Sequence, residues 1–136
     1  LTIGGVWTDA SDRNQKENFR PVDPETVLET VAQLPVTTWN YKVEDPSVRH
    51  MGPVAQDFYA AFGLGADDKH IASLDANGVA LAAIQGLYAR NQEQAARIEA
   101  LEAQNAELQT QLDALEQRLA ALERRVNGPT PARSSL

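Results

Sequence analysis

The first residues that could do chemistry lie in one polar stretch, "DASDRNQKENF" (residues 9–19), where Ser11 and Lys16 stand five positions apart. A serine hydroxyl becomes a nucleophile when a base removes its proton, and a lysine can be that base only as the neutral amine. Burial favours the neutral amine because it penalises the ammonium. A Ser–Lys pair therefore needs side chains within reach, which a turn allows better than a helix, and a site that hides Lys16 from water.

Spacing alone does not separate such a pair from an ordinary surface loop, in which Ser11 and Asp12 would simply cap a turn. The other titratable residues indicate no metal site. His50 and His70 have no partner at a metal-ligand spacing, and the acidic pairs lack the series of oxygen ligands that a calcium loop needs. The chain has no cysteine, so it has neither disulfides nor thiolate sites. We expect no metal and no cofactor.

Composition narrows the class of protein. The chain has 136 residues, a hydrophobic share of 43% and a formal net charge of −7, as expected for about one globular domain. Both halves are acidic, which argues against nucleic acid and anionic membranes as partners. No apolar run approaches the roughly 18–20 residues of a membrane span, and no signal peptide opens the chain. Because Leu1 is not a natural initiator, we expect a piece cut from a longer protein.

The sequence divides into four regions. Residues 1–10 are typical of the end of an upstream β-rich stalk. Residues 11–80 form a small mixed domain whose core would be marginal alone. Residues 81–127 form one long helix, and residues 128–136 are a flexible tail after a helix stop. The predicted fold class is therefore α+β, a small mixed domain followed by a long C-terminal helix.

Local signals place the elements of the mixed domain. Asp23-Pro24 predicts a helix start that Pro35 terminates, and alternating residues over 36–43 predict a strand. Apolar residues at helical spacing then predict a second helix, closed by Gly63 and Gly65. The stretch "HIASLDANGVA" predicts a short strand and a turn at Asp75–Gly78.

The long helix carries an unbroken heptad pattern, which predicts a coiled coil because such a helix is not stable with its apolar stripe in water. The a and d positions of the predicted core are Ile84, Leu87, Asn91, Gln94, Ile98, Leu101, Asn105, Leu108, Leu112, Leu115, Leu119, Leu122 and Val126.

Charges and polar core residues predict parallel, aligned chains. Arg97 at g and Glu102 at the following e would meet between parallel chains, and a second pair repeats this relation. Asn91, Gln94 and Asn105 cost stability in the core unless each meets its own copy, which favours a homo-oligomer in register. These residues leave two and three strands both open.

Three motifs in this order resemble a known family. "SDRNQKENFRPV", "LPVTTWNYKVEDPSVRHMGPVAQDF" and "IASLDANGVALAAIQGLYARN", followed by a heptad coil, are similar to the C-terminal intramolecular chaperone domain of phage tail spikes and tail fibres. This is the peptidase S74 family, known from endosialidases. The resemblance covers about residues 9–100. It implies a parallel homotrimer that templates the folding of the β-stalk upstream in the same chain and then releases itself by cutting.

The resemblance also implies roles for individual residues. Ser11 matches the family's nucleophile and Lys16 its general base, so the expected scissile bond joins Ala10 to Ser11. Attack on the bond of the same chain and attack on another chain both stay open. Further candidates, for support of the site or the fold, are Asp12, His50, Gly52 and Gln56. The setting implied is a virion tail fibre or a bacterial cell surface.

Two other functions compete with self-cleavage. The same fold could be a structural trimerisation module of a tail fibre or surface adhesin that never cuts. A regulator released from a membrane would need a transmembrane helix and a basic DNA-binding part, and these residues contain neither. Burial of Lys16 beside Ser11 would favour cutting, and a solvated Lys16 would leave only the scaffold role.

Overall fold

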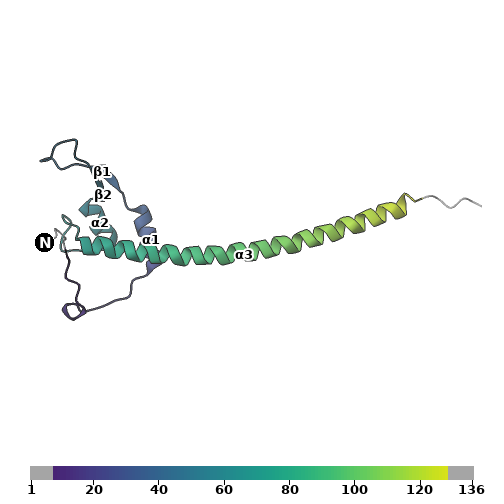
Figure 1. The fold of residues 1–136 in the computed structure, drawn as a ribbon, viewed down its shortest axis with the longest axis horizontal. Helices are drawn as coiled ribbons and strands as arrows, with labels where there is room; N and C mark the ends of the chain where they lie inside the picture. The colour runs from purple at the N-terminus through teal and green to yellow at the C-terminus, as the bar shows by residue number, and fades with distance from the viewer. Residues whose placement is uncertain (1–7, 129–136) are drawn as a thin grey trace, which may run out of the picture. The chain divides into compact units, whose positions relative to one another are not determined.

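The computed structural model describes residues 8–128, and in them Figure 1 shows a small sheet, short helices and one long helix. The elements in chain order are the 3₁₀ turn η1 (Arg13–Gln15), α1 (Pro24–Gln33), β1 (Thr37–Trp39), β2 (His50–Gly52), α2 (Ala55–Phe62) and α3 (Ser73–Val126). The predicted α+β class is confirmed. The predictions for residues 1–10 and 128–136 fall mostly outside the described residues, and residues 8–10 have no regular secondary structure.

The chain divides into two compact units, one that ends at Asn91 and one that begins at Gln92. The first unit contains all the shorter elements and the first turns of α3. The second contains the rest of that helix. Among the described residues, no helix combines the length and the apolar character that crossing a bilayer requires.

Helix α1 begins as predicted. The Asp23 carboxylate accepts hydrogen bonds from the Glu25 N–H at 3.2 Å and the Thr26 hydroxyl at 2.5 Å, and Pro24 occupies the first turn. The Thr26 hydroxyl, and then the Glu25 N–H, hold the pKa of Asp23 below its ordinary value because both stabilise the carboxylate. The helix ends at Gln33, immediately before Leu34-Pro35.

The strand predicted over 36–43 is wrong in length. Strand β1 stops at Trp39, and Thr37–Trp39 pair antiparallel with His50–Gly52. The chain turns away because Tyr41 uses both of its backbone groups locally: its N–H donates to the Glu44 carboxylate at 3.2 Å and its carbonyl accepts from the Glu44 N–H at 3.1 Å. The chain turns again at Asp45-Pro46, where the Asp45 carbonyl accepts a hydrogen bond from the Val48 N–H.

Helix α2 also ends where the sequence predicts. Gly63 adopts the left-handed conformation with φ of 62° and donates its N–H to the Tyr59 carbonyl at 2.8 Å. Glycine adopts this conformation without the steric cost that a Cβ would add. Phe58 faces inward with 4% of its surface exposed and lies 5.0 Å from the Phe62 ring, so α2 supplies the aromatic part of the core.

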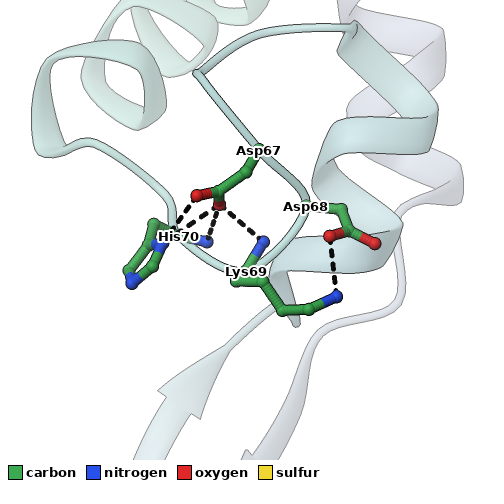
Figure 2. Close-up of polar contacts among 4 residues, drawn as sticks. All are labelled: Asp67, Asp68, Lys69 and His70. Atoms are coloured by element: carbon green, nitrogen blue, oxygen red, sulfur yellow. Dashed lines mark hydrogen bonds and ion pairs between the residues drawn. The ribbon is translucent and has the colours of Figure 1, made fainter.

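The strand and turn predicted for "HIASLDANGVA" are wrong, because α3 already begins at Ser73 and includes Asp75–Gly78. The turn lies earlier, at Asp67 (Figure 2). The Asp67 carboxylate accepts from the Lys69 N–H at 2.8 Å and the His70 N–H at 3.0 Å, and it contacts the His70 ring. Burial of the adjacent residue Val79 outweighs the turn preference of Asn77-Gly78.

A glycine allows α1 and α3 to approach each other closely within the first unit. A Cβ on Gly86 would overlap the Pro24 carbonyl oxygen and lie 2.8 Å from its carbonyl carbon. One turn further along, Arg90 donates to the Glu25 and Glu29 carboxylates at 3.0 and 3.1 Å. Gly86 is buried together with Val79 and Ala83 of the same helix.

Candidate functional site

The segment that contains Ser11 and Lys16 folds back on itself. The Asp12 carboxylate caps η1 by accepting from the Asn14 backbone N–H at 3.0 Å and the Asn14 side-chain amide at 3.1 Å. The Lys16 N–H closes the turn on the Arg13 carbonyl at 3.1 Å. As a result the Lys16 Nζ lies 2.6 Å from the Ser11 Oγ, so the structure brings the two predicted residues together.

The burial that a Ser–Lys pair requires for cutting is not present within the single chain. Ser11 and Lys16 are both exposed, as are all residues of η1. A lysine ammonium carries no lone pair, so it can only donate to the serine oxygen. To act as a base, Lys16 must instead accept the hydroxyl proton as the neutral amine, which burial favours. The single chain therefore brings the two side chains into contact but does not bury Lys16. Its burial would have to come from outside the single chain.

Apolar side chains that follow the pair are also exposed. Phe19 is 63% exposed and Val22 is 62% exposed. The Arg13 guanidinium lies 5.6 Å from the centroid of the Phe19 ring, a cation–π contact across the loop. Asn18 turns the chain between them with φ of 56°, a conformation that asparagine tolerates better than most residues. The loop therefore has defined local structure and an uncovered apolar side.

A second contact joins this loop to α3. The Ser73 hydroxyl donates to the Asp9 Oδ2 at 2.6 Å. Asp9 precedes the Ala10–Ser11 bond, and Ser73 is the first residue of α3. Sequence reasoning missed this contact because 64 positions separate the two residues and no local pattern links them.

The other predicted candidates gather at the hairpin. His50 lies between aromatic rings, 4.9 Å from Trp39 and 5.4 Å from Tyr41, and its Nε2 contacts the Glu44 carboxylate at 2.9 Å. Gly52 pairs with Thr37 at the end of the sheet. Within residues 8–128, no hydrogen bond or ion pair joins these residues to Ser11 or Lys16.

Gln56 lines a pocket of about 460 Å³ beside the hairpin. The pocket is also lined by Trp39, Tyr41, His70 and Ile71. The Trp39 Nε1 is buried, and the described residues offer it no acceptor. Gln56 and Trp39 thus line the same pocket, and the His50 ring lies 4.9 Å from that tryptophan.

The predicted core of the coil is uncovered in the single chain. Helix α3 runs without a break to Val126, as the heptads predict. From Ile98 on, the large apolar side chains at a and d are between 48% and 81% exposed. These residues are Ile98, Leu101, Leu108, Leu112, Leu115, Leu119, Leu122 and Val126.

The acidic residues do not form a metal-binding set. In the part of the chain that the structure describes, no group of three or more His, Asp or Glu side chains is placed to hold a metal ion. Asp67 binds the Lys69 backbone and the His70 ring, which lower its pKa in that order, and Lys69 pairs with Asp68 at 2.7 Å (Figure 2). Their contacts are those of a structured turn.

Comparison with family models decides what the loop and hairpin are. Residues 11–63 match the Peptidase_S74 family, described as chaperone of endosialidase. This segment is similar to the Peptidase S74 family. The match begins at Ser11, contains Lys16 and η1, and ends at Gly63, the glycine that closes α2. A search of curated proteins found no match to the chain. The resemblance drawn from the sequence motifs is therefore confirmed over the loop, α1, the hairpin and α2.

Proposed function

We propose that this chain is a C-terminal intramolecular chaperone, which assembles as a parallel homotrimer, templates the folding of an upstream β-rich stalk and releases itself by cutting between Ala10 and Ser11. The observation that carries the proposal is the 2.6 Å contact between the Lys16 Nζ and the Ser11 Oγ. It lies at the start of a segment of the Peptidase S74 family. The setting that fits is a phage tail fibre or a bacterial surface fibre.

The chemistry needs only these two side chains and water. The neutral Lys16 amine takes the Ser11 hydroxyl proton as the Oγ attacks the Ala10 carbonyl carbon. The Ala10–Ser11 amide bond breaks, the leaving nitrogen accepts a proton from Lys16, and an ester to the Ser11 Oγ remains. Water then hydrolyses the ester, which frees the Ala10 carboxylate and restores the Ser11 hydroxyl. The Ser11 of the same chain or of a neighbouring chain could make the attack.

Assembly would supply the burial that the single chain lacks. Phe19 and Val22 leave an apolar side of the loop uncovered, and α3 exposes its heptad core. Association of several copies of the chain would bury both apolar surfaces. Burial of apolar surface favours association by a free energy of roughly 25 cal/mol per Å². A partner chain over the loop would exclude water from Lys16 and favour its neutral form. Cutting would then follow assembly.

Coupling the cut to assembly suits a long β-stalk. Aligning three chains that make few local contacts is slow, and a trimeric coil provides a nucleus in register. Once the chaperone leaves, the stalk would stay folded for kinetic reasons, because its refolding nucleus is gone. If the chaperone stayed attached, the stalk could unfold and refold reversibly.

One observation favours a second function, a permanent trimerisation module that never cuts. Lys16 and Ser11 are exposed in the chain as it stands, and an exposed lysine is a poor base at neutral pH. In this alternative the loop is a capped surface turn, held by Asp12 as any short turn would be. The scaffold role of α3 is the same in both functions.

The intact mass of a chain that carries several dozen native upstream residues separates the two functions. We expect the wild type to split before Ser11, and Ser11→Ala and Lys16→Ala to stay whole. Lys16→Arg should also stay whole, because a guanidinium keeps its charge and cannot act as the base. Lys42→Ala, which removes another exposed lysine, is the matched control and should split. A wild type that assembles and stays whole would establish the permanent module.

A further inference from the structure

Two side-chain contacts flank the proposed scissile bond, one upstream of it and one downstream of it along the chain. On its downstream side, Lys16 contacts Ser11. On its upstream side, Asp9 accepts the 2.6 Å hydrogen bond from the Ser73 hydroxyl. The Ala10 carbonyl, which the nucleophile must reach, stands between these contacts. The downstream contact is held by η1, and the upstream contact is held by the first residue of α3.

We propose that Asp9 and Ser73 are positioning residues, which fix the Ala10–Ser11 bond against the start of α3 so that its carbonyl faces the nucleophile. This inference rests on the proposed self-cleavage and adds a requirement to it. Asp9 would leave with the stalk, whereas Ser73 would stay with the chaperone. The same hydrogen bond therefore holds the substrate before the cut and is a contact between the two products after it.

The start of α3 is a favourable place for an aspartate anchor. The first backbone N–H groups of a helix have no partner within the helix, and the helix dipole favours negative charge there. Asp75, in the first turn of α3, is a second carboxylate near this end of the helix. The Ser73 hydroxyl gives Asp9 a directed hydrogen bond, so orientation as well as charge is specified.

Fixing the bond matters because residues 8–10 have no regular secondary structure to orient it. Holding a reacting carbonyl in an attack geometry accounts for a large part of the rate of an intramolecular reaction, and a misplacement of about 1 Å can cost roughly 100-fold. Without the Asp9–Ser73 contact, the Ala10 carbonyl would sample many orientations while Ser11 and Lys16 stayed together. The loss would appear in the rate of cutting and leave assembly intact.

The test is a double-mutant cycle on the rate of self-cleavage, measured on assembled protein isolated by size exclusion from a chain with its native upstream residues. We expect Asp9→Ala and Ser73→Ala each to slow cutting roughly 10- to 100-fold. The double variant should cut no more slowly than either single, because both remove one contact. Ser73→Thr keeps the hydroxyl and Asp9→Asn keeps an acceptor oxygen, so both should recover most of the rate.

The controls separate positioning from a structural role. Asp57→Ala removes an exposed carboxylate of α2 and should cut at the wild-type rate. Sedimentation and melting temperature should be unchanged in all variants, and Ser73→Thr must rescue. If Asp9→Ala and Ser73→Ala cut at the wild-type rate, the inference is overturned and self-cleavage stands. The same holds if the two effects add independently in the double variant. A wild type that stays whole overturns the proposed function and the inference with it.

Discussion

The geometry of the Ser–Lys contact is set by a residue between them. Asp12 caps η1 through the Asn14 N–H, and that turn directs Lys16 back onto Ser11. The sequence predicts that these two side chains can meet, because five positions fit a turn. It does not predict their exposure, since burial of a loop depends on surfaces far away in the chain or in another copy.

Asp23 provides a test of how one capping side chain links pH to stability. Hydrogen bonds from Thr26 and Glu25 hold the pKa of Asp23 below its ordinary value. A carboxylate with a lowered pKa in the folded state contributes stability that is complete above the unfolded pKa and is lost as pH falls through the folded pKa. We expect Asp23→Asn, which caps the helix but does not titrate, to flatten the acid limb of stability below about pH 4.

The measurement is the melting temperature of wild type and Asp23→Asn between about pH 2 and pH 7. The two proteins should melt alike near neutrality, and the melting temperature of the wild type should fall below that of Asp23→Asn as the wild-type cap is protonated. Asp57→Asn removes an exposed carboxylate elsewhere and is the matched control for loss of one negative charge. Parallel curves for wild type and Asp23→Asn would contradict a contribution from the cap.

Among the elements, the sequence predicts helices better than strands. The start of α1, the end of α2 and the unbroken course of α3 follow from local signals, namely a capping aspartate, a left-handed glycine and heptads. Strand β1 is shorter than predicted because its alternation continues into a turn that Glu44 organises. Asn77-Gly78 is typical of a turn. Its helical conformation depends on the burial of Val79, and that burial cannot be predicted from the local sequence.

The close approach of α1 to α3 gives a prediction with an internal control. A methyl group on Gly86 would overlap the Pro24 backbone, which cannot move aside as a flexible side chain could. We therefore expect Gly86→Ala to destabilise the protein by about 1–3 kcal/mol, as overpacking does. Gly78 lies in the same helix, and a methyl group there would have nothing within 4 Å. Gly78→Ala should stabilise by about 0.5–1 kcal/mol.

Urea unfolding monitored by circular dichroism measures both glycine variants against wild type under one condition. Because both substitutions add the same methyl group to the same helix, the difference between them isolates the contact with α1. Equal shifts of the unfolding midpoint in the same direction would show that Gly86 makes no close approach in solution.

For the whole molecule, the number of associated chains is the decisive quantity. Ile84 and Ile98 at a with leucine at d, and Asn105 at a, favour two strands, whereas Leu112 and Leu119 at a leave three open. The three-chain assembly that we propose would draw on the first unit as well. There the e positions of α3 add Leu81 and Tyr88, which are 64% and 66% exposed and widen the apolar face beyond a and d.

Disrupting the core of the coil should separate the chains. Leu115 occupies a d position and is 59% exposed in the single chain. We expect Leu115→Glu to abolish association, since it would place like charges together in a desolvated core. Gln117→Glu introduces the same charge at an outward f position and should leave the assembly intact. Sedimentation equilibrium gives both masses, and a Leu115→Glu protein of unchanged mass would refute the predicted core.

The aromatic cluster of the hairpin has a practical consequence for spectroscopy. The chain has two tryptophans, Trp7 before the proposed cut and Trp39 after it. The Trp39 ring lies 4.9 Å from the His50 ring and, edge to face, 5.0 Å from the Tyr41 ring, an environment that shifts and quenches indole emission when it forms. A fragment that begins at Ser11 would emit from Trp39 alone. The molecule thus contains its own optical label, which would distinguish the fluorescence of the released module from that of the stalk without any added dye.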